Sequence, residues 1–399
     1  MFLSERIRTI KPSPTLAINA TSASMRQSGL DVINFGVGEP DFDTPEHIRS
    51  EAVRAIEAGY TRYTAVGGMP ELKDAIIEKF RRDNNLSYKP EQVMVSCGGK
   101  HVLYNLAQAT LNPGDEVIIP TPYWVSYPPI VHLAGGRPVI IETKEADDFK
   151  LSPDALEEAI TSRTRFLILN SPSNPTGSVY SRSELEALAE VILRHDVCVV
   201  SDEIYEKIIF DGTPFFSIAQ VSEEAKAKTF VVNGLSKAYA MTGWRIGYVA
   251  GDREVIAGMT KVQSQSTSNP NSIAQQAAIE ALNGPQDSVL TMVRAFDRRR
   301  KYIVGRLNAI PGIHCPMPAG AFYVFPNFSH YFKETHEGTK IKGSADLCEY
   351  LLREAHVALV PGIAFGDDNF IRFSYAMGLD AIKEGIDRIE EALEKLVGP

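Results

Sequence analysis

The sequence predicts an α/β protein with a mostly parallel sheet in a large domain and a smaller α+β domain. Its 399 residues exceed what a single hydrophobic core usually serves. Between about residues 93 and 251, short β-rich runs alternate with helical patterns, as in sheets covered by helices on both faces. The last third mixes helices and strands differently. We therefore expect a large domain over residues 45–295 and a small domain formed by residues 1–44 together with 296–399.

The β-rich runs are short, apolar and bounded by turn residues, which is typical of buried strands. In chain order they are "QVMVSC", "DEVIIP", "RPVIIE", "RFLILN", "VCVVSD", "TFVVNG" and "RIGYVAG". The intervening segments "KHVLYNLAQATLNPGD" and "SRSELEALAEVILRHD" carry apolar residues at helical spacing. The sequence therefore predicts helical crossovers between parallel strands.

The last third begins with a basic helix, "VRAFDRRRKYIVGRLNAI", followed by the strand-like "AGAFYVFPNF". A helix "SADLCEYLLREAHV", a strand "FIRFSYA" and a final helix from about Leu379 complete it. The N-terminal "DVINFGVGEPDF" contains a short strand-like stretch. We expect this stretch to pack on the C-terminal elements.

Composition limits the possible functions. Hydrophobic residues make up 44% and charged residues 23%, as in ordinary globular proteins. The net charge of −9, without a long basic run, argues against a nucleic-acid or membrane partner. No stretch approaches the length of a membrane span. Four widely spaced cysteines and a start without an apolar segment predict a reduced, cytoplasmic protein that acts on small molecules. We expect no metal.

Polar residues follow several predicted strands, and ligands of open α/β sheets bind at the carboxyl ends of strands. Glycine amides at a helix start can bind phosphate. A lysine becomes a nucleophile when it is desolvated or close to other cations. Together with an acid for a ring nitrogen, these groups suit pyridoxal phosphate. The residues are Gly98, Gly99, Lys100, Asn174, Asp202, Tyr205, Ser236 and Lys237, with Arg245 eight positions after the lysine.

Five motifs in this order, "GEPDFDTP", "NPTG", "SDEIY", "LSKAYAMTGWRIGY" and "FIRFSYA", resemble the class I aminotransferases of pyridoxal-phosphate fold type I. The resemblance covers nearly the whole chain. It implies a large cofactor-binding domain with a mostly parallel seven-stranded sheet, and a small domain. It also implies ping-pong transfer of an amino group between amino acids and 2-oxo acids.

The resemblance also implies roles for single residues. Lys237 would anchor pyridoxal 5'-phosphate covalently and shuttle the proton at the substrate Cα. Asp202 would pair with the ring nitrogen, and Tyr205 and Asn174 would hydrogen-bond the phenolic oxygen. Trp124 would stack on the ring, although Tyr123 beside it could do so instead.

The phosphate would be held by Gly99, Lys100, Ser236 and Arg245, with Tyr63 reaching in from a second subunit, so that a homodimer is expected. Arg372 would bind the substrate α-carboxylate, with Gly38 close to it and with Trp124 and Asn174 lining the same space. The family also leads us to expect cis peptide bonds before Pro122 and Pro175.

The resemblance is greatest to bacterial aspartate and aspartate/prephenate aminotransferases. It implies a distal-carboxylate site at Lys11, Ser13, Thr15 and Lys100. The better-known branch of the family uses an arginine of the neighbouring subunit instead, and the corresponding segment here, "KVQSQSTSNPNS", contains none. The expected reaction moves the amino group of L-aspartate to 2-oxoglutarate, forming oxaloacetate and L-glutamate. The alternatives are prephenate as acceptor, which gives arogenate, an aromatic or broad specificity, or a pyridoxal-phosphate β-lyase.

Two further classes are disfavoured. No G-x-G-x-x-G follows an early strand, as a nicotinamide enzyme would require. Transcription regulators with an aminotransferase-like domain carry an additional N-terminal DNA-binding domain. The chain starts too close to "GEPDF" for us to expect one.

Overall fold

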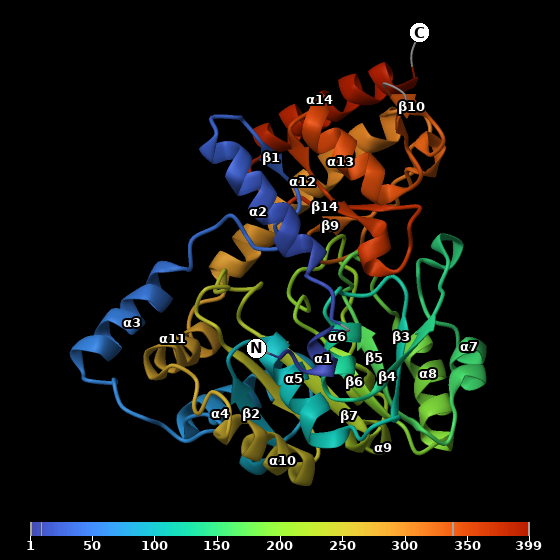
Figure 1. Cartoon of the computed structure of the whole chain (residues 1–399). Coiled ribbons are helices and arrows are strands. Elements are labelled where there is room, and N and C mark those ends of the chain that lie inside the picture. The colour runs from blue at the N-terminus through green and yellow to red at the C-terminus, as the bar shows by residue number, and fades with distance from the viewer. Residues whose placement is uncertain (1, 9, 337–338, 398–399) are drawn as a thin grey trace.

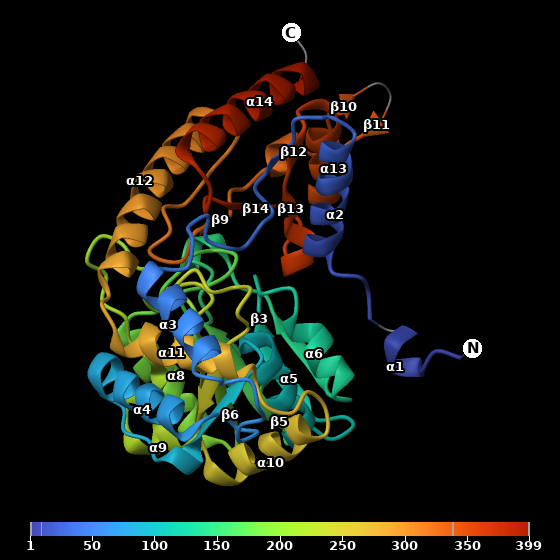
Figure 2. The same cartoon turned by 90° about the vertical axis from the view of Figure 1, so that its left-hand side faces the viewer.

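The computed structural model describes residues 2–8, 10–336 and 339–397 (Figure 1). One part, the sheet body, contains the seven-stranded sheet and the helices packed on it. The other, the terminal body, gathers elements from both ends of the chain at the top of the view. A long helix, α12 (Asp287–Ala309), runs from one body to the other (Figure 2). We propose the division at residues 44/45 and 295/296, the second of which lies within α12.

The seven predicted runs all form strands of one sheet, in the order β2-β8-β7-β6-β5-β3-β4. Only β8 is antiparallel to its neighbours, β2 and β7, so the other six carboxyl ends share one edge. The mostly parallel seven-stranded sheet is thus confirmed. The strands are β2 (Val93–Ser96), β3 (Glu116–Pro120), β4 (Arg137–Ile141), β5 (Thr164–Asn170), β6 (Cys198–Asp202), β7 (Thr229–Gly234) and β8 (Gly247–Ala250).

Helices cover both faces of this sheet, which explains why the strands are continuously apolar. Ile118 packs with the cluster that includes Leu188 of α8, whereas its neighbours Val117 and Ile119 pack with that of Leu106 of α5. The helices are α3 (Glu46–Glu57), α4 (Pro70–Asn84), α5 (Gly99–Thr110), α6 (Tyr127–Leu133), α7 (Pro153–Ala159), α8 (Arg182–Arg194), α9 (Glu223–Ala227), α10 (Arg253–Ser264) and α11 (Ser272–Asn283). The two predicted crossover helices, α5 and α8, are confirmed.

The terminal body joins the two ends of the chain through backbone pairing. Its strand β1 (Ile33–Asn34) is parallel to β12 (Val357–Ala358), so the N-terminal stretch packs on the C-terminal elements as expected. A small antiparallel sheet has the order β13-β14-β9. The remaining elements are α2 (Pro14–Gln27), β9 (Tyr323–Val324), β10 (Thr335–His336), β11 (Thr339–Lys340), α13 (Ser344–Glu354), β13 (Val360–Pro361), β14 (Ile371–Ser374) and α14 (Leu379–Val397). The short helix α1 (Glu5–Arg8) precedes them in the chain and lies beside α6 of the sheet body (Figure 2).

Single turns of 3₁₀ helix connect these elements in the described residues: η1 (Pro90–Gln92), η2 (Glu145–Asp147), η3 (Ile218–Gln220), η4 (Ser329–Tyr331) and η5 (Gly362–Phe365). Both expected cis peptide bonds, before Pro122 and Pro175, are present, and a third precedes Pro172. Within the described part of the chain, no helix has the length and apolar character needed to cross a bilayer.

Candidate active site

The predicted polar residues meet where β5, β6 and β7 end, facing the terminal body. Asn170, the last residue of β5, donates from Nδ2 to the backbone oxygen of Asp202 at 2.9 Å. Its Oδ1 accepts from the backbone N–H of Asn174 at 2.8 Å. The side chain of Asn170 therefore ties the "NPTG" loop to the end of β6.

Lys237 lies just past β7 in a desolvated position between the two bodies. Its Nζ donates to the backbone oxygen of Gly38 and lies 5.9 Å from the centre of the Phe322 ring. Burial, helped by the positive charges of Arg372 and Arg245, lowers the pKa of this lysine to about 8. Near neutral pH a useful fraction of the amine is therefore uncharged and nucleophilic.

Asp202 ends β6 and is buried. Burial raises its pKa to about 6, although the hydroxyl of Tyr127, which donates to Oδ2 at 2.8 Å, favours the charged form. The charge of Lys237 acts in the same direction as Tyr127. The backbone N–H of Ile204 donates to Oδ1 of Asp202 at 3.4 Å, and none of the described residues forms an ion pair with this carboxylate. It can therefore accept a cationic or N–H partner.

Tyr127 connects Asp202 to Trp124. The two rings are in edge contact, with centroids 5.4 Å apart, and Lys100 Nζ lies 4.9 Å from the centre of the Trp124 ring. The backbone N–H of Tyr123 donates to the oxygen of Phe365, a Cβ built on Gly366 would lie 2.8 Å from its ring, and the residue lines a cavity together with Tyr127. Trp124 thus contacts the ring whose hydroxyl binds Asp202, and its stacking on a cofactor remains a prediction.

Arg372 of β14 is buried, being 2% exposed, and faces the same space. It donates to Oδ1 of Asn174 at 3.0 Å and to the oxygen of Gly36 at 2.8 Å. Its Nε–H is buried without an acceptor. No acid in the described residues forms an ion pair with it, and burial lowers its pKa. An unpaired buried charge is costly, so the site suits an anionic ligand.

A second group of residues that could hold an anion lies where α5 begins. Gly98 precedes the helix at a φ of +92°, a backbone conformation that favours glycine, and a Cβ there would lie 2.3 Å from Nη2 of Arg245. Arg245 donates to the backbone oxygens of Thr242 and Cys97, at 2.8 and 3.3 Å. Burial and the charge of Arg245 lower the pKa of Lys100. Ser236, beside Lys237, is also buried.

Four predicted residues lie apart from this cluster in the single chain. Tyr63 is 91% exposed, as expected of a residue that would serve another subunit. The side chains of Lys11, Ser13 and Thr15 form no hydrogen bond or ion pair with the described residues. They lie around the connection from α1 to the start of α2 (Figure 2). Their roles remain predictions.

Three residues of the site are not predicted from the sequence. Tyr127 follows Trp124 by three positions, a spacing that could have indicated a shared face. Asn170 ends a predicted strand, a position at which polar side chains indicate a ligand site. Tyr323 lies in "AGAFYVFPNF", and its hydroxyl is 2.8 Å from that of Tyr205. Nothing in the local pattern distinguishes Tyr323 from the aromatic residues around it.

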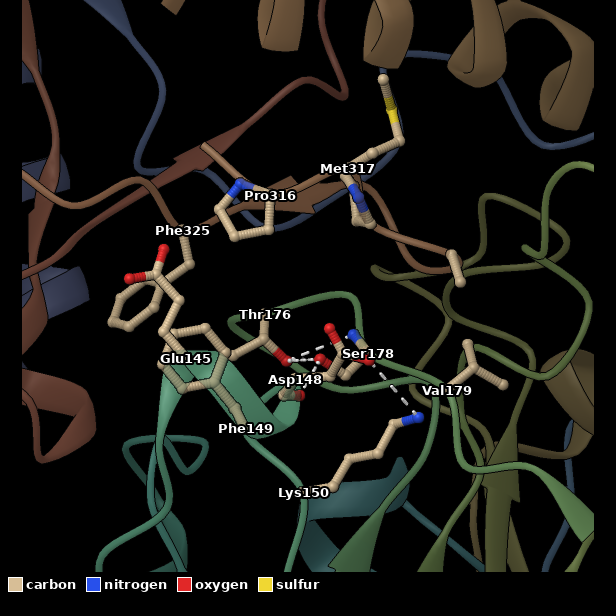
Figure 3. Close-up of a pocket in the computed structure, with 12 residues that line it drawn as sticks. Glu145, Asp148, Phe149, Lys150, Thr176, Ser178, Val179, Pro316, Met317 and Phe325 are labelled. Atoms are coloured by element: carbon tan, nitrogen blue, oxygen red, sulfur yellow. Dashed lines mark hydrogen bonds and ion pairs between the residues drawn. The ribbon is translucent and has the colours of Figure 1, made fainter. Parts of the chain in front are cut away.

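A separate pocket of about 100 Å³ lies behind the "NPTG" loop, between the two bodies (Figure 3). Pro316 and Met317 border it from the terminal body, and Glu145 and Lys150 from the sheet body. Lys150 already pairs with Glu184, at 3.0 Å. No residue predicted for the active site lines this pocket.

Comparison with known proteins agrees with this geometry. The family model for aminotransferase class I and II matches residues 30–389. Aspartate aminotransferase of Bacillus sp. (strain YM-2) is 52% identical, covering 97% of this chain and 98% of the relative. Aspartate/prephenate aminotransferase of Nitrosomonas europaea is 50% identical, covering 98% of this chain and 100% of the relative.

Solved structures give the same result. The aspartate aminotransferase of Rhizobium meliloti has a TM-score of 0.96 and 49% identity, covering 99% of this chain and 100% of the other. The enzyme of Thermus thermophilus with maleate has a TM-score of 0.93 and 44% identity, covering 98% and 100%. The expected aminotransferase fold is confirmed, and the chain belongs to the family of class I and II aminotransferases.

Proposed function

We propose that this aminotransferase uses pyridoxal 5'-phosphate to move the amino group of L-aspartate to 2-oxoglutarate by a ping-pong mechanism. Oxaloacetate and L-glutamate are the products. The observation that carries the proposal is the buried Arg372, which has no acidic partner in the described residues and a free Nε–H. Every amino acid and 2-oxo acid brings the α-carboxylate that this guanidinium lacks.

The residues present fit the cofactor. Lys237 offers an amine for its aldehyde, Asp202 an anion for its ring nitrogen, and the start of α5 with Arg245 a cradle for its phosphate. When bound, pyridoxal phosphate supplies the electron sink for negative charge at the substrate Cα. The holding set we propose is Gly99, Lys100, Trp124, Asn174, Asp202, Tyr205, Ser236, Lys237 and Arg245, with Tyr63 of a second subunit.

The same lysine would move the proton. An amine with a pKa of about 8 can both accept and return a proton near neutral pH. Arg372 and Asn174, already hydrogen-bonded to each other, would fix the α-carboxylate so that Cα faces that amine. Gly38 would close the space from the terminal body, where its oxygen already accepts from Lys237.

The preference for a second carboxylate rests on Lys11, Ser13, Thr15 and Lys100. Support comes from relatives named aspartate aminotransferase and from a solved relative with maleate, a dicarboxylate. Other relatives are named aspartate/prephenate aminotransferase. Prephenate is therefore our second candidate acceptor. We further propose a homodimer, because Tyr63 is solvent-exposed in the single chain, and a reduced, cytoplasmic setting, because the four cysteines are unpaired.

Steady-state assays would test the reaction and its specificity together. We expect oxaloacetate from L-aspartate and 2-oxoglutarate, and a loss of about 10²–10³ in kcat/KM when Arg372→Leu removes the carboxylate-binding group. Prephenate with L-aspartate tests the second candidate. Pyruvate released from a substrate with a β leaving group, without any transamination, would instead indicate a β-lyase. Reaction with aromatic amino acids alone would keep the class and overturn the aspartate preference.

A further inference from the structure

Two buried tyrosines link the bodies at the centre of the site. Tyr205 comes from the sheet body, just after β6, and Tyr323 from β9 of the terminal body. Their hydroxyl oxygens are 2.8 Å apart, and their rings are in edge contact with centroids 5.7 Å apart. Both side chains are almost fully excluded from solvent. Their hydroxyls therefore depend on each other, or on a ligand, for hydrogen bonds.

The ring of Tyr323 also supports the arginine proposed to bind substrate. The Arg372 guanidinium lies 4.6 Å from the centre of this ring, and Phe365 lies 5.0 Å away from the same guanidinium. The register of the small sheet places Ser374 of β14 opposite Tyr323. One pair of strands therefore carries both residues and fixes the ring beside the guanidinium, a favourable arrangement of cation and aromatic face.

The hydroxyl of Tyr323 further restricts the segment that covers Lys237. A Cβ built on Gly38 would lie 2.6 Å from that hydroxyl. The backbone oxygen of Gly38 is the acceptor for the Lys237 amine. The side chain of Tyr323 thus lies against three residues with proposed functions: Tyr205, Arg372 and Gly38.

We propose that Tyr323 is a positioning residue that couples the carboxylate site at Arg372 to the hydrogen bond Tyr205 makes with the cofactor. This inference rests on the proposed function. A phenol hydroxyl has one proton to donate and lone pairs to accept with. If Tyr205 donates to the phenolic oxygen of the cofactor, its remaining bond to Tyr323 requires Tyr323 to be the donor. The orientation of the Tyr205 proton then follows from Tyr323.

This arrangement strengthens the bond that Tyr205 donates, because hydrogen bonds in a chain polarise one another. A bond donated to the phenolic oxygen favours the form of the cofactor in which that oxygen is most negative. Losing the Tyr323 hydroxyl should therefore raise the pH at which the absorption band of the bound cofactor changes. The charged groups that face the tyrosine pair are Arg372 and Asp202, and both stay in place in the test.

The test compares Tyr323→Phe with Tyr331→Phe, a matched control. Tyr331 is another buried tyrosine of the terminal body, whose hydroxyl donates to the oxygen of Pro311 at 2.6 Å. For Tyr323→Phe we expect the spectral transition to move up by about half to one pH unit, the scale of one ordinary hydrogen bond. We expect kcat to fall about five- to tenfold for the same reason, with KM for L-aspartate nearly unchanged because the ring remains. Tyr331→Phe should leave both properties as in the wild type.

A double-mutant cycle with Tyr205→Phe separates positioning from a general structural role. With the Tyr205 hydroxyl absent, adding Tyr323→Phe should change the spectral transition no further. The unfolding temperatures of the cofactor-free variants should behave in the same way: the effects of the two substitutions should not add up in the double variant. Equal effects of Tyr323→Phe in both backgrounds, or a result matching Tyr331→Phe, would overturn the inference while leaving transamination intact. A wild-type protein that does not transaminate would overturn the proposed function itself.

Discussion

At the scale of single residues, the environment of Lys237 determines how much of its amine is uncharged and able to react. Its pKa is lowered to about 8 because burial removes water from the ammonium, and Arg372 and Arg245 repel it. Glu39 and Asp202 oppose this shift. The neutral amine therefore becomes abundant as the pH rises through about 8, well below the range of an exposed lysine.

The first prediction concerns the attachment of the cofactor to cofactor-free protein. The rate should rise with pH and level off above about 8, because only the neutral lysine reacts. Glu39→Gln removes an anion that stabilises the ammonium, so the midpoint should move to lower pH. Stopped-flow absorbance between about pH 6 and 10, a range that includes the lowered pKa of Lys237 and approaches that of an ordinary lysine, would measure the midpoints of the wild type and of the variant. A wild-type midpoint near that of an ordinary lysine would contradict the proposed environment.

The second prediction concerns Glu203, the neighbour of Asp202 that points into a buried polar cluster. Burial, followed by the charge of Glu206, raises its pKa to about 8, against the opposing effects of Ser217, Ser201 and Lys79. Its Oε2 has no hydrogen-bond partner. The folded state therefore holds a proton that the unfolded state releases, so its contribution to stability is lost as the pH rises from about 4.5 to about 8.

Glu203→Gln should keep the two hydroxyl contacts at Oε1 and remove this titration. We expect the variant to equal the wild type near pH 5 and to be more stable by about 1–3 kcal/mol near pH 8. Urea unfolding at both pH values would measure the difference. A stability difference that does not change with pH would show that Glu203 does not titrate in this range.

Most of the candidate residues could be predicted from the sequence because strand ends and family motifs mark them. Lys237, Asp202 and Asn174 follow predicted strands and lie at the carboxyl-end edge of the large sheet, and Arg372 faces them from β14 of the terminal body. Their roles remain predictions. Tyr127 and Tyr323 could not be found in this way. Their hydroxyls form hydrogen bonds with Asp202 and Tyr205, which lie 75 and 118 positions away in the sequence and come close only in the folded chain.

At the scale of elements, the buried strands were predictable because both of their faces are apolar. Helices whose sequences show a weaker pattern were not predicted. Among them are α2, which begins at Pro14 with polar and small residues, and α3 and α4. The basic helix also starts earlier than expected, at Asp287. These helices depend on tertiary packing, whereas the sheet strands carry their own pattern.

The third prediction concerns the loop that carries Tyr63. Gln275 of α11 is fully buried; its Oε1 accepts from the N–H of Met69 at 2.8 Å, and its Nε2 donates to Thr64 at 3.0 Å. Gln275→Ala would free the loop and leave buried groups unpaired, so we expect a loss of about 1–3 kcal/mol in stability. Cofactor affinity should also fall, because Tyr63 would be less well placed. Gln108→Ala is a suitable control.

Gln108 lies on α5 and donates to the oxygen of Leu133 at 3.1 Å, away from the Tyr63 loop. Calorimetry and cofactor titration of both variants would separate the effects. Weaker cofactor binding in Gln275→Ala alone would support the link from α11 to Tyr63. Similar affinities in both variants would show that the loop is placed without Gln275.

At the scale of the whole molecule, the chain presents two bodies with the site between them, and the proposed site residue Tyr63 is 91% exposed in the single chain. The fourth prediction tests whether a second subunit uses it. Lys237→Ala and Tyr63→Leu subunits should each be weakly active alone. A mixed dimer would contain one complete site, formed by the lysine of one subunit and the tyrosine of the other.

Unfolding and refolding the two variants together should therefore restore activity, up to about a quarter of the wild-type value for random pairing in a twofold dimer. The separately refolded variants serve as controls. If the mixture is no more active than their sum, Tyr63 acts within its own subunit or not at all.

The most direct measurement of the central proposal is the absorbance of the protein reconstituted with pyridoxal phosphate, before and after L-aspartate is added without any oxo acid. We expect a band of lysine-bound cofactor that is absent from Lys237→Ala, and its conversion by L-aspartate to the band of the aminated cofactor. Conversion by aromatic or neutral amino acids but not by L-aspartate would overturn the proposed substrate. A wild-type protein without the lysine-bound band would contradict the assignment of Lys237 and everything that depends on it.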